Sequence, residues 1–216
     1  MIKKKVTYIS DEGFEFKFEP IEDSLKIKKI KTGFEARYLI QSEGFDPRED
    51  DNIGIMVCFH KRYTLGDKLE FGKNIKQEFS SDDFNGWEEM KEHLIKTEKA
   101  ICILPLYLYD HSGISMKVGS FQGLLPQGHA EFDSGQVGFI YTTKKQMEKI
   151  GVEKYSKKKI EEYLIQEVET YNQYITGDCY SLVKETYNKD KEQINYDILG
   201  GFFGYNDSLK ALKTEI

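Results

Sequence analysis

Cysteine, proline and arginine are scarce in this sequence, and each scarcity excludes a class of protein or site. The 216 residues contain three cysteines and four prolines. Because Cys58, Cys102 and Cys179 form no Cys-x-x-Cys pair, we expect reduced thiols in the cytoplasm and neither a disulfide framework nor a four-cysteine zinc site. No apolar run reaches the roughly 18–20 residues of a membrane span, and no apolar segment follows the basic start. We therefore expect no membrane contact and no secretory signal.

Arginine is limited to three positions, Arg37, Arg48 and Arg62. The net charge is −6, from 31 basic and 37 acidic residues. Proteins that bind nucleic acid usually present a basic face, and they read guanine and phosphate with paired arginine N–H groups. We therefore expect no direct DNA readout, and no cofactor is indicated.

Aromatic residues are abundant, with 14 tyrosines and 14 phenylalanines, so the chain can bury a sizeable core. Phe14, Phe16 and Phe18 alternate with charged residues, which predicts a half-buried strand that ends at Pro20. Apolar runs of strand length predict further strands over residues 25–27, 34–40, 53–59, 101–109, 136–141, 179–187 and 194–203.

Helical spacing predicts one helix after Ser81 and a longer one after Ser156. Shorter helices are expected before Gly151 and after Asn206, and residues 113–135 read as glycine-rich loops. The order of elements favours an α+β protein, with a mixed or antiparallel sheet and about three to four helices. We expect a single domain over residues 1–216, in which residues 1–42 are a candidate N-terminal β subdomain.

A polar run, Asp110, His111 and Ser112, lies where a predicted strand meets Gly113. Adjacent side chains point in different directions and the members of a catalytic triad come from distant segments, so adjacency alone does not make a triad. In the simpler interpretation Asp110 and Ser112 cap the turn while His111 bonds locally.

A second polar run, Asp133, Ser134 and Gln136, leads into another predicted strand. If the two strands pair as a hairpin, Asp133 faces Asp110 and His111 across it, and residues 115–131 form a lid or arm. These three residues would then be the catalytic groups of an enzyme, with Ser112, Ser134 and Gln136 binding the ligand. Turn formation again explains Asp-Ser-Gly without any function.

Cys58 and His60 occupy alternate positions of a predicted strand, and alternate positions share one face of a sheet. The pair could bind a ligand or act as a nucleophile with its base. It could also contribute to a metal site with His111 or His129, but two ligands do not make a site and we predict no metal. In the simpler interpretation Cys58 is a core residue.

The loop over residues 43–51 is acidic but lacks the regular calcium-binding pattern. Its residues Glu49, Asp50 and Asp51 could bind a basic partner or simply remain solvated. Glu167 lies beside the apolar stripe of the long helix, where it is either a candidate acid or base or a hydrogen-bond partner of a tyrosine.

Several segments together resemble a family of hypothetical proteins encoded by phages, plasmids and conjugative elements of Gram-positive bacteria. The resemblance covers roughly residues 53–204 and is carried by MVCFHKRY (56–63), LGD (65–67), LPLYLYDHSG (104–113), DSGQVGFIY (133–141), EVETYNQY (167–174), Gly177 and GGFFG (200–204). Accessory genes of such elements often encode inhibitors of host defence, such as anti-CRISPR or antirestriction proteins. The resemblance therefore implies an anti-defence protein that binds a host immune effector or its nucleoprotein complex.

Two functions follow, and their geometry distinguishes them. The first is the binding inhibitor, as a monomer or homodimer, which blocks a defence protein or traps a nucleotide. The second is a small hydrolase or nucleotide-binding protein. If Cys58, His60, Asp110, His111 and Asp133 share one pocket, a ligand site is favoured; if they scatter and an acidic or apolar patch is exposed, the inhibitor is favoured.

Overall fold

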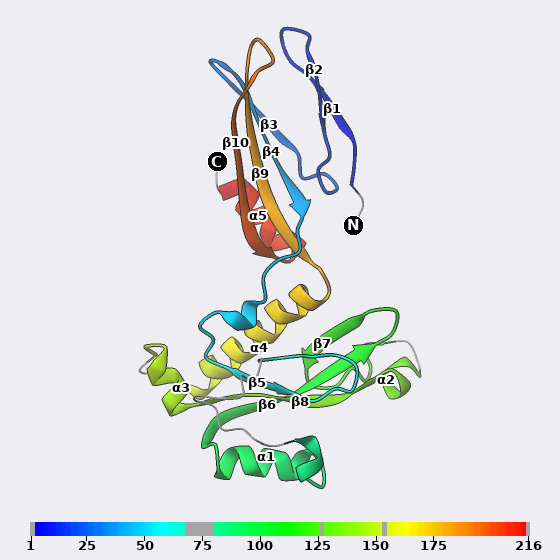
Figure 1. Ribbon diagram of the computed structural model, residues 1–216, viewed down its shortest axis with the longest axis vertical. Helices are drawn as coiled ribbons and strands as arrows, with labels where there is room; N and C mark the ends of the chain where they lie inside the picture. Colours follow the sequence, from blue (N-terminus) through cyan, green and yellow to red (C-terminus); the bar gives the residue numbers. More distant parts are fainter. Residues whose placement is uncertain (1–2, 68–79, 126–127, 153–154, 215–216) are drawn as a thin grey trace. The chain divides into compact units, whose positions relative to one another are not determined.

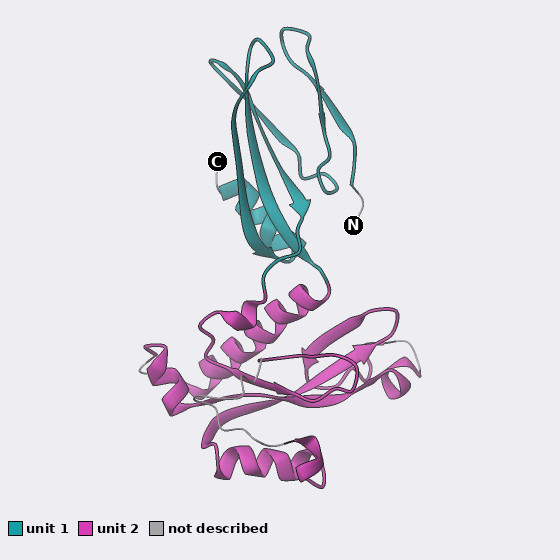
Figure 2. Cartoon of the chain, viewed as in Figure 1, with its two compact units in different colours: residues 1–45, 177–216 teal, residues 46–176 magenta. Residues whose placement is uncertain are grey.

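The computed structural model describes residues 3–67, 80–125, 128–152 and 155–214. The chain divides into two compact units (Figure 2). Unit 1 combines residues 1–45 with residues 177–216, and unit 2 consists of residues 46–176. The N-terminal strands that we expected as a subdomain of residues 1–42 thus lie in one unit with the C-terminal part of the chain.

Unit 1 contains a four-stranded antiparallel sheet in the order β10-β9-β4-β3, together with a separate β1–β2 hairpin (Figure 1). Its elements are β1 (Val6–Ile9), β2 (Glu15–Phe18), β3 (Lys26–Ile30), β4 (Gly33–Gln41), β9 (Cys179–Asn188), β10 (Gln193–Phe203) and the helix α5 (Tyr205–Thr214).

Each face of this sheet has its own apolar cover, as the alternation of strand residues requires. On one face an aromatic cluster joins the hairpin to the sheet and contains Phe16, Phe18, Phe34, Tyr38 and Tyr187. On the other face Leu39 and Leu182 pack against Leu212 of α5. The burial predicted for alternate phenylalanines is confirmed for Phe16 and Phe18 of β2, whereas Phe14 precedes this strand and is 38% exposed.

Unit 2 contains a second four-stranded antiparallel sheet, in the order β5-β8-β6-β7. Helix α4 packs on one face of it, and α1 covers the other through Met90 and Leu94 against Phe139 and Tyr141 (Figure 1). Its elements are η1 (Pro47–Glu49), β5 (Ile55–Cys58), η2 (Ser81–Asp83), α1 (Trp87–Lys96), β6 (Ala100–Asp110), β7 (Ile114–Val118), α2 (His129–Phe132), β8 (Ser134–Thr143), α3 (Lys144–Lys149) and α4 (Lys157–Ile175).

The predicted α+β class is confirmed, and both large sheets are antiparallel. Five α-helices occur among the described residues, slightly more than the expected three to four. The segment 113–135, expected to be loop, contains β7 and the four-residue α2. Ile114, Met116 and Val118 alternate with polar residues, so β7 carried a period-2 signal that was missed, whereas α2 is too short for helical periodicity. Within the described part of the chain, no helix is both long and apolar enough to cross a membrane.

The backbones of β5 and β8 approach very closely at Gly138. A Cβ atom at this position would lie 1.9 Å from the carbonyl oxygen of Val57. Next to it, the register of β8 against β6 shifts between the pairs of Gly138 and Gln136, so Val137 is an extra residue in a β-bulge. Glycine at position 138 is therefore a packing requirement.

We predict that Gly138→Ala lowers the free energy of unfolding by about 1–3 kcal/mol, because the added methyl group must separate the two strands. Urea denaturation measures the change. Gly135→Ala in the same strand is the matched control, because a Cβ atom at that position meets no atom within 4 Å. Equal losses for the two variants would contradict the close approach.

Candidate functional site

Polar residues from two strands meet where β6 and β8 pair. Tyr109 lies opposite Ser134 in the antiparallel register, and the N–H group of Asp110 donates to the carbonyl oxygen of Asp133 at 2.8 Å. The predicted hairpin pairing of these segments is thus present. The connecting segment contributes β7 to the sheet instead of a free lid, and its residues 126–127 lie outside the described part of the chain.

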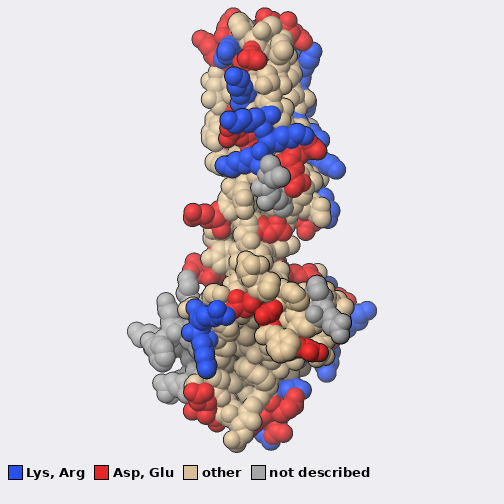
Figure 3. Space-filling model, turned by 90° about the vertical axis from the view of Figure 1, so that its right-hand side faces the viewer, with Lys and Arg blue, Asp and Glu red and all other residues tan. Residues whose placement is uncertain are grey.

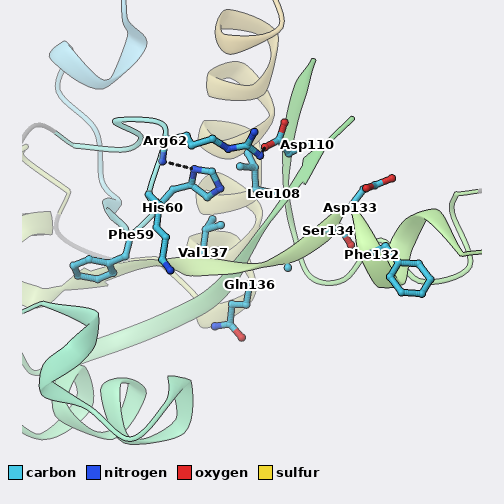
Figure 4. A pocket seen from close by; sticks show the side chains of 12 residues that line it. Phe59, His60, Arg62, Leu108, Asp110, Phe132, Asp133, Ser134, Gln136 and Val137 are labelled. Carbon is cyan, nitrogen blue, oxygen red and sulfur yellow. Dashed lines mark hydrogen bonds and ion pairs between the residues drawn. The ribbon is translucent and has the colours of Figure 1, made fainter. Parts of the chain in front are cut away.

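A pocket of about 520 Å³ opens at this place (Figure 4). It combines residues that follow β5 with residues from the ends of β6 and β8. Five of the residues proposed from the sequence line it, namely His60, Asp110, Asp133, Ser134 and Gln136, together with the basic residues Lys61 and Arg62. The structure therefore brings five of the eleven proposed residues to one pocket, and His111 and Cys58 are not among them.

One side of the pocket is formed by a linked group around Asp110. Arg62 donates through Nη2 to one carboxylate oxygen of Asp110, and the Tyr63 hydroxyl lies 3.2 Å from the other. The His60 ring stacks on the Tyr63 ring at a centroid distance of 5.0 Å, and its Nδ1 accepts from the backbone N–H group of Arg62 at 3.3 Å (Figure 4). In neutral His60 the proton is then on Nε2, so the ring offers a donor.

A second group lies at the rim and is centred on Asp133, whose side chain points away from Arg62 and Asp110 in Figure 4. His111 Nδ1 donates to Asp133 Oδ2 at 2.9 Å, and His129 Nδ1 lies 3.8 Å from the same oxygen. One potential ligand atom from each of these three residues lies within 4.8 Å of the others. Two imidazoles and a carboxylate are ligands that transition metals bind well.

Tyr109 supports this rim cluster of His111, His129 and Asp133. Its hydroxyl lies 3.2 Å from His129 Nδ1, and its ring stacks nearly parallel to that of His111, with an angle of 14° between the planes. Residues that contact metal-ligating histidines in this way fix the orientation of their rings.

Cys58 does not join the pocket. It packs against the core of unit 2, and burial raises the pKa of its thiol to about 12. A thiol with such a pKa supplies almost no thiolate near neutral pH, so the interpretation of Cys58 as a nucleophile with His60 as its base has no support here. The simpler interpretation, a core thiol, agrees with its position.

The serine and glutamine side chains serve local structure. Ser112, with φ of 53°, donates through its hydroxyl to the carbonyl oxygen of His111 at 2.7 Å. The Ser134 hydroxyl donates to the carbonyl oxygen of Ala130 at 2.5 Å, and the Gln136 side chain donates to the carbonyl oxygen of Gly138 at 3.3 Å. The turn interpretation thus accounts for the hydroxyls of Ser112 and Ser134.

The acidic residues Glu49, Asp50 and Asp51 lie at the end of η1 and do not line the pocket. Asp50 and Asp51 are exposed. The turn before them is fixed, because Asp46 accepts a hydrogen bond from the backbone N–H group of Arg48 at 2.9 Å. The structure thus presents these two carboxylates on a turn with a defined geometry.

Glu167 belongs to a buried ion group that sequence reasoning missed. The Arg48 side chain, 2% exposed, donates to Glu167 at 3.0 Å and to Asp67 at 2.7 Å. Burial raises the pKa of Glu167, while Arg48 and the backbone N–H groups of Ile53 and Gly54 act in the opposite direction. Glu167 therefore accepts hydrogen bonds from Arg48 and from backbone N–H groups, where the sequence had suggested a tyrosine as its partner.

Arg62 and Tyr109 were absent from the site proposed from the sequence, and His129 was named there only as a candidate metal partner of Cys58 and His60. A signal for His129 was present, because it precedes Asp133 by four residues and this spacing places two side chains on one side of a helix. Arg62 gave no comparable signal, since its contact with Asp110 joins segments 48 residues apart.

Comparison of the chain with models of protein families, with curated proteins and with solved structures gave no match. The resemblance to proteins of mobile elements stays a prediction.

We predict that Cys58 resists thiol reagents in the folded protein. An ordinary cysteine is roughly a quarter ionised at pH 8, whereas a thiol with a pKa of about 12 is ionised in about one molecule in 10⁴. Kinetics with a chromogenic disulfide, in buffer and in urea, should show fast labelling of all three cysteines only after unfolding. Rapid labelling that maps to Cys58 in buffer would restore it as a candidate nucleophile.

Proposed function

We propose that unit 2 is a small hydrolase domain that acts on a phosphate-bearing, nucleotide-type ligand with the help of a divalent transition metal. The observation that carries this proposal is the rim cluster of His111, His129 and Asp133 beside a pocket with two basic side chains. No metal was expected from the sequence, because Cys58 and His60, with His111 or His129 added, gave no complete ligand set, and Asp133 was not considered as a ligand.

The basic side chains supply the recognition of phosphate. The Arg62 side chain is 69% exposed, and only its Nη2 atom is used by Asp110, so its remaining N–H groups can donate to a phosphate. Lys61 beside it is exposed and adds a mobile positive charge. Phe132, which is 86% exposed at the edge of the pocket, offers a ring on which a base can stack.

The rim cluster supplies the chemistry. His111, His129 and Asp133 would hold the metal ion through two imidazoles and one carboxylate. When bound, a divalent transition metal would supply an activated water molecule and a Lewis acid for hydrolysis of a phosphate ester. Tyr109, in contact with both histidine rings, keeps them in place.

We expect His129→Ala and Asp133→Asn to weaken the binding of Zn²⁺ or Mn²⁺ by at least about tenfold and to abolish hydrolysis of a nucleotide panel. Isothermal titration and phosphate release measure the two effects. Both side chains are partly exposed, so the variants should fold, which circular dichroism checks. His93→Ala on α1 is the matched control for the loss of a histidine. Equal metal affinity in all four proteins would contradict the proposal.

A second candidate is the anti-defence inhibitor, which would bind a host immune effector or its nucleoprotein complex. It is supported by the exposed carboxylates of Asp50 and Asp51 on a fixed turn, since a rigid acidic surface suits a basic partner. The resemblance to proteins of mobile elements points in the same direction. In this case the pocket would trap a nucleotide or have no part in binding.

We expect reversal of the charges at Glu49, Asp50 and Asp51 to lysine to remove a basic partner from pulldowns out of a bacterial host lysate. The loss follows from like-charge repulsion at the interface. Reversal of Glu161, Glu162 and Glu169, all exposed on α4, makes the same change in net charge and is the control. If capture of the partner survives the first reversal, the acidic turn is not its binding surface.

A further inference from the structure

Strand β10 is an open edge of the sheet in unit 1. The strand order β10-β9-β4-β3 leaves β10 with a neighbour on one side only. Among the described residues, the strand from Gln193 to Phe203 forms backbone hydrogen bonds with β9 alone. An eleven-residue edge of unpaired N–H and C=O groups is a template on which another strand can pair.

The two edges of this sheet carry very different side chains. The opposite edge, β3, has Lys26, Lys28 and Lys29 among five residues, and lysines are a common means of blocking edge-to-edge pairing. Figure 3, which views the molecule from the side on which β1 and β2 lie in Figure 1, shows basic side chains gathered on that face of unit 1. In β10 the single charged residue is Asp197. The β3 edge is therefore blocked by lysines, whereas β10 departs from regular pairing between Gln193 and Asn195 and between Leu199 and Phe202 and is regular over the residues from Asn195 to Leu199.

The β10 edge also exposes large apolar side chains. Ile194, Tyr196, Ile198 and Leu199 are between 50% and 55% exposed. Tyr196 and Ile198 lie opposite Glu185 and Val183 of β9 and continue the face of the sheet that the aromatic cluster covers elsewhere. An apolar stripe along an unpaired strand marks an interaction surface.

We propose that two copies of the chain pair through β10, antiparallel, about a twofold axis at Tyr196. In this register Tyr196 faces its own copy, Ile194 faces Ile198, and Asn195 faces Asp197. Asn195 already donates to Asp197 of its own strand at 2.6 Å, and pairing exchanges the one bond within each copy for two bonds across the axis, so neither side chain loses its partner. The strand is thus complementary to itself in both its apolar and its polar positions.

Neighbouring registers lack this complementarity. With a twofold axis perpendicular to the sheet, residues that face each other lie on the same face of the sheet. The nearest alternative registers therefore place the axis one residue earlier or later. An axis at Asp197 places two carboxylates against each other, and an axis at Asn195 places Ile198 against Glu192. Like charges directly opposite destabilise a pair of strands, so the axis at Tyr196 is favoured.

The first test is the mass of the full chain as a function of concentration, by analytical ultracentrifugation. We expect a monomer–dimer equilibrium, and Ile198→Lys should raise the dissociation constant by at least about tenfold, because the lysine lies against an isoleucine. Ile9→Lys on β1 is the matched control, since Ile9 is 64% exposed on a strand of the same unit. A wild-type chain that remains monomeric up to about millimolar concentration overturns the proposal, whatever other chain β10 binds.

The second test examines the register. Tyr196→Cys places a thiol opposite its copy on the axis, where opposite Cβ atoms are roughly 4.5–5.5 Å apart, so mild oxidation should give a covalent dimer. Leu199→Cys, which faces Gln193 in the same register, should crosslink at least about tenfold more slowly. Equal rates for the two variants overturn the register. These readouts concern unit 1 alone and are independent of metal binding and hydrolysis.

Discussion

Unit 2 depends on one buried ion group, in which Arg48 joins the carboxylates of Asp67 and Glu167. The three residues come from the turn after Asp46, the segment beyond β5 and helix α4. Removing one member of such a group leaves an uncompensated buried charge, which costs about 3–5 kcal/mol. That is a large share of the stability of an ordinary domain. Because each charge is compensated only when the others are in place, the ion group fixes the three segments relative to one another.

This arrangement also positions the pocket. Glu167 accepts hydrogen bonds from the N–H groups of Ile53 and Gly54, and Asp67 accepts one from the N–H group of Met56. Both carboxylates of the ion group therefore fix the backbone at the start of β5. A Cβ atom at Gly54 would lie 2.6 Å from a Glu167 oxygen, so the close approach requires glycine. His60 and Arg62 follow β5 directly and line the pocket. The contact of Arg62 with Asp110 then joins this segment to β6.

Many of the helices and strands of this fold were predictable from local sequence patterns, whereas few contacts of the site and of the ion group were. The stripe of α4 followed from periodicity, and the pairing of β6 with β8 was posed as a condition. That pairing places His111 against Asp133, whereas the Asp110 side chain contacts Arg62 and Tyr63. The ion group could not be predicted, since 119 residues separate Arg48 from Glu167 and nothing local relates them. His129 was considered only as a metal partner of His60, and its spacing of four residues from Asp133 was not used as a signal. Chemistry that depends on long-range contacts needs the structure.

The two proposals concern different units, and together they separate the candidate functions. If β10 joins two copies, each assembly carries two pockets and two acidic turns. A partner that engages both gains affinity from the second contact, because that contact is made within one complex, provided that both can be reached at once. A mononucleotide occupies one pocket and gains nothing. Dimerisation is therefore useful to an inhibitor of a large or symmetric effector and is irrelevant to hydrolysis per site, so the state of β10 should affect only one of the two functions.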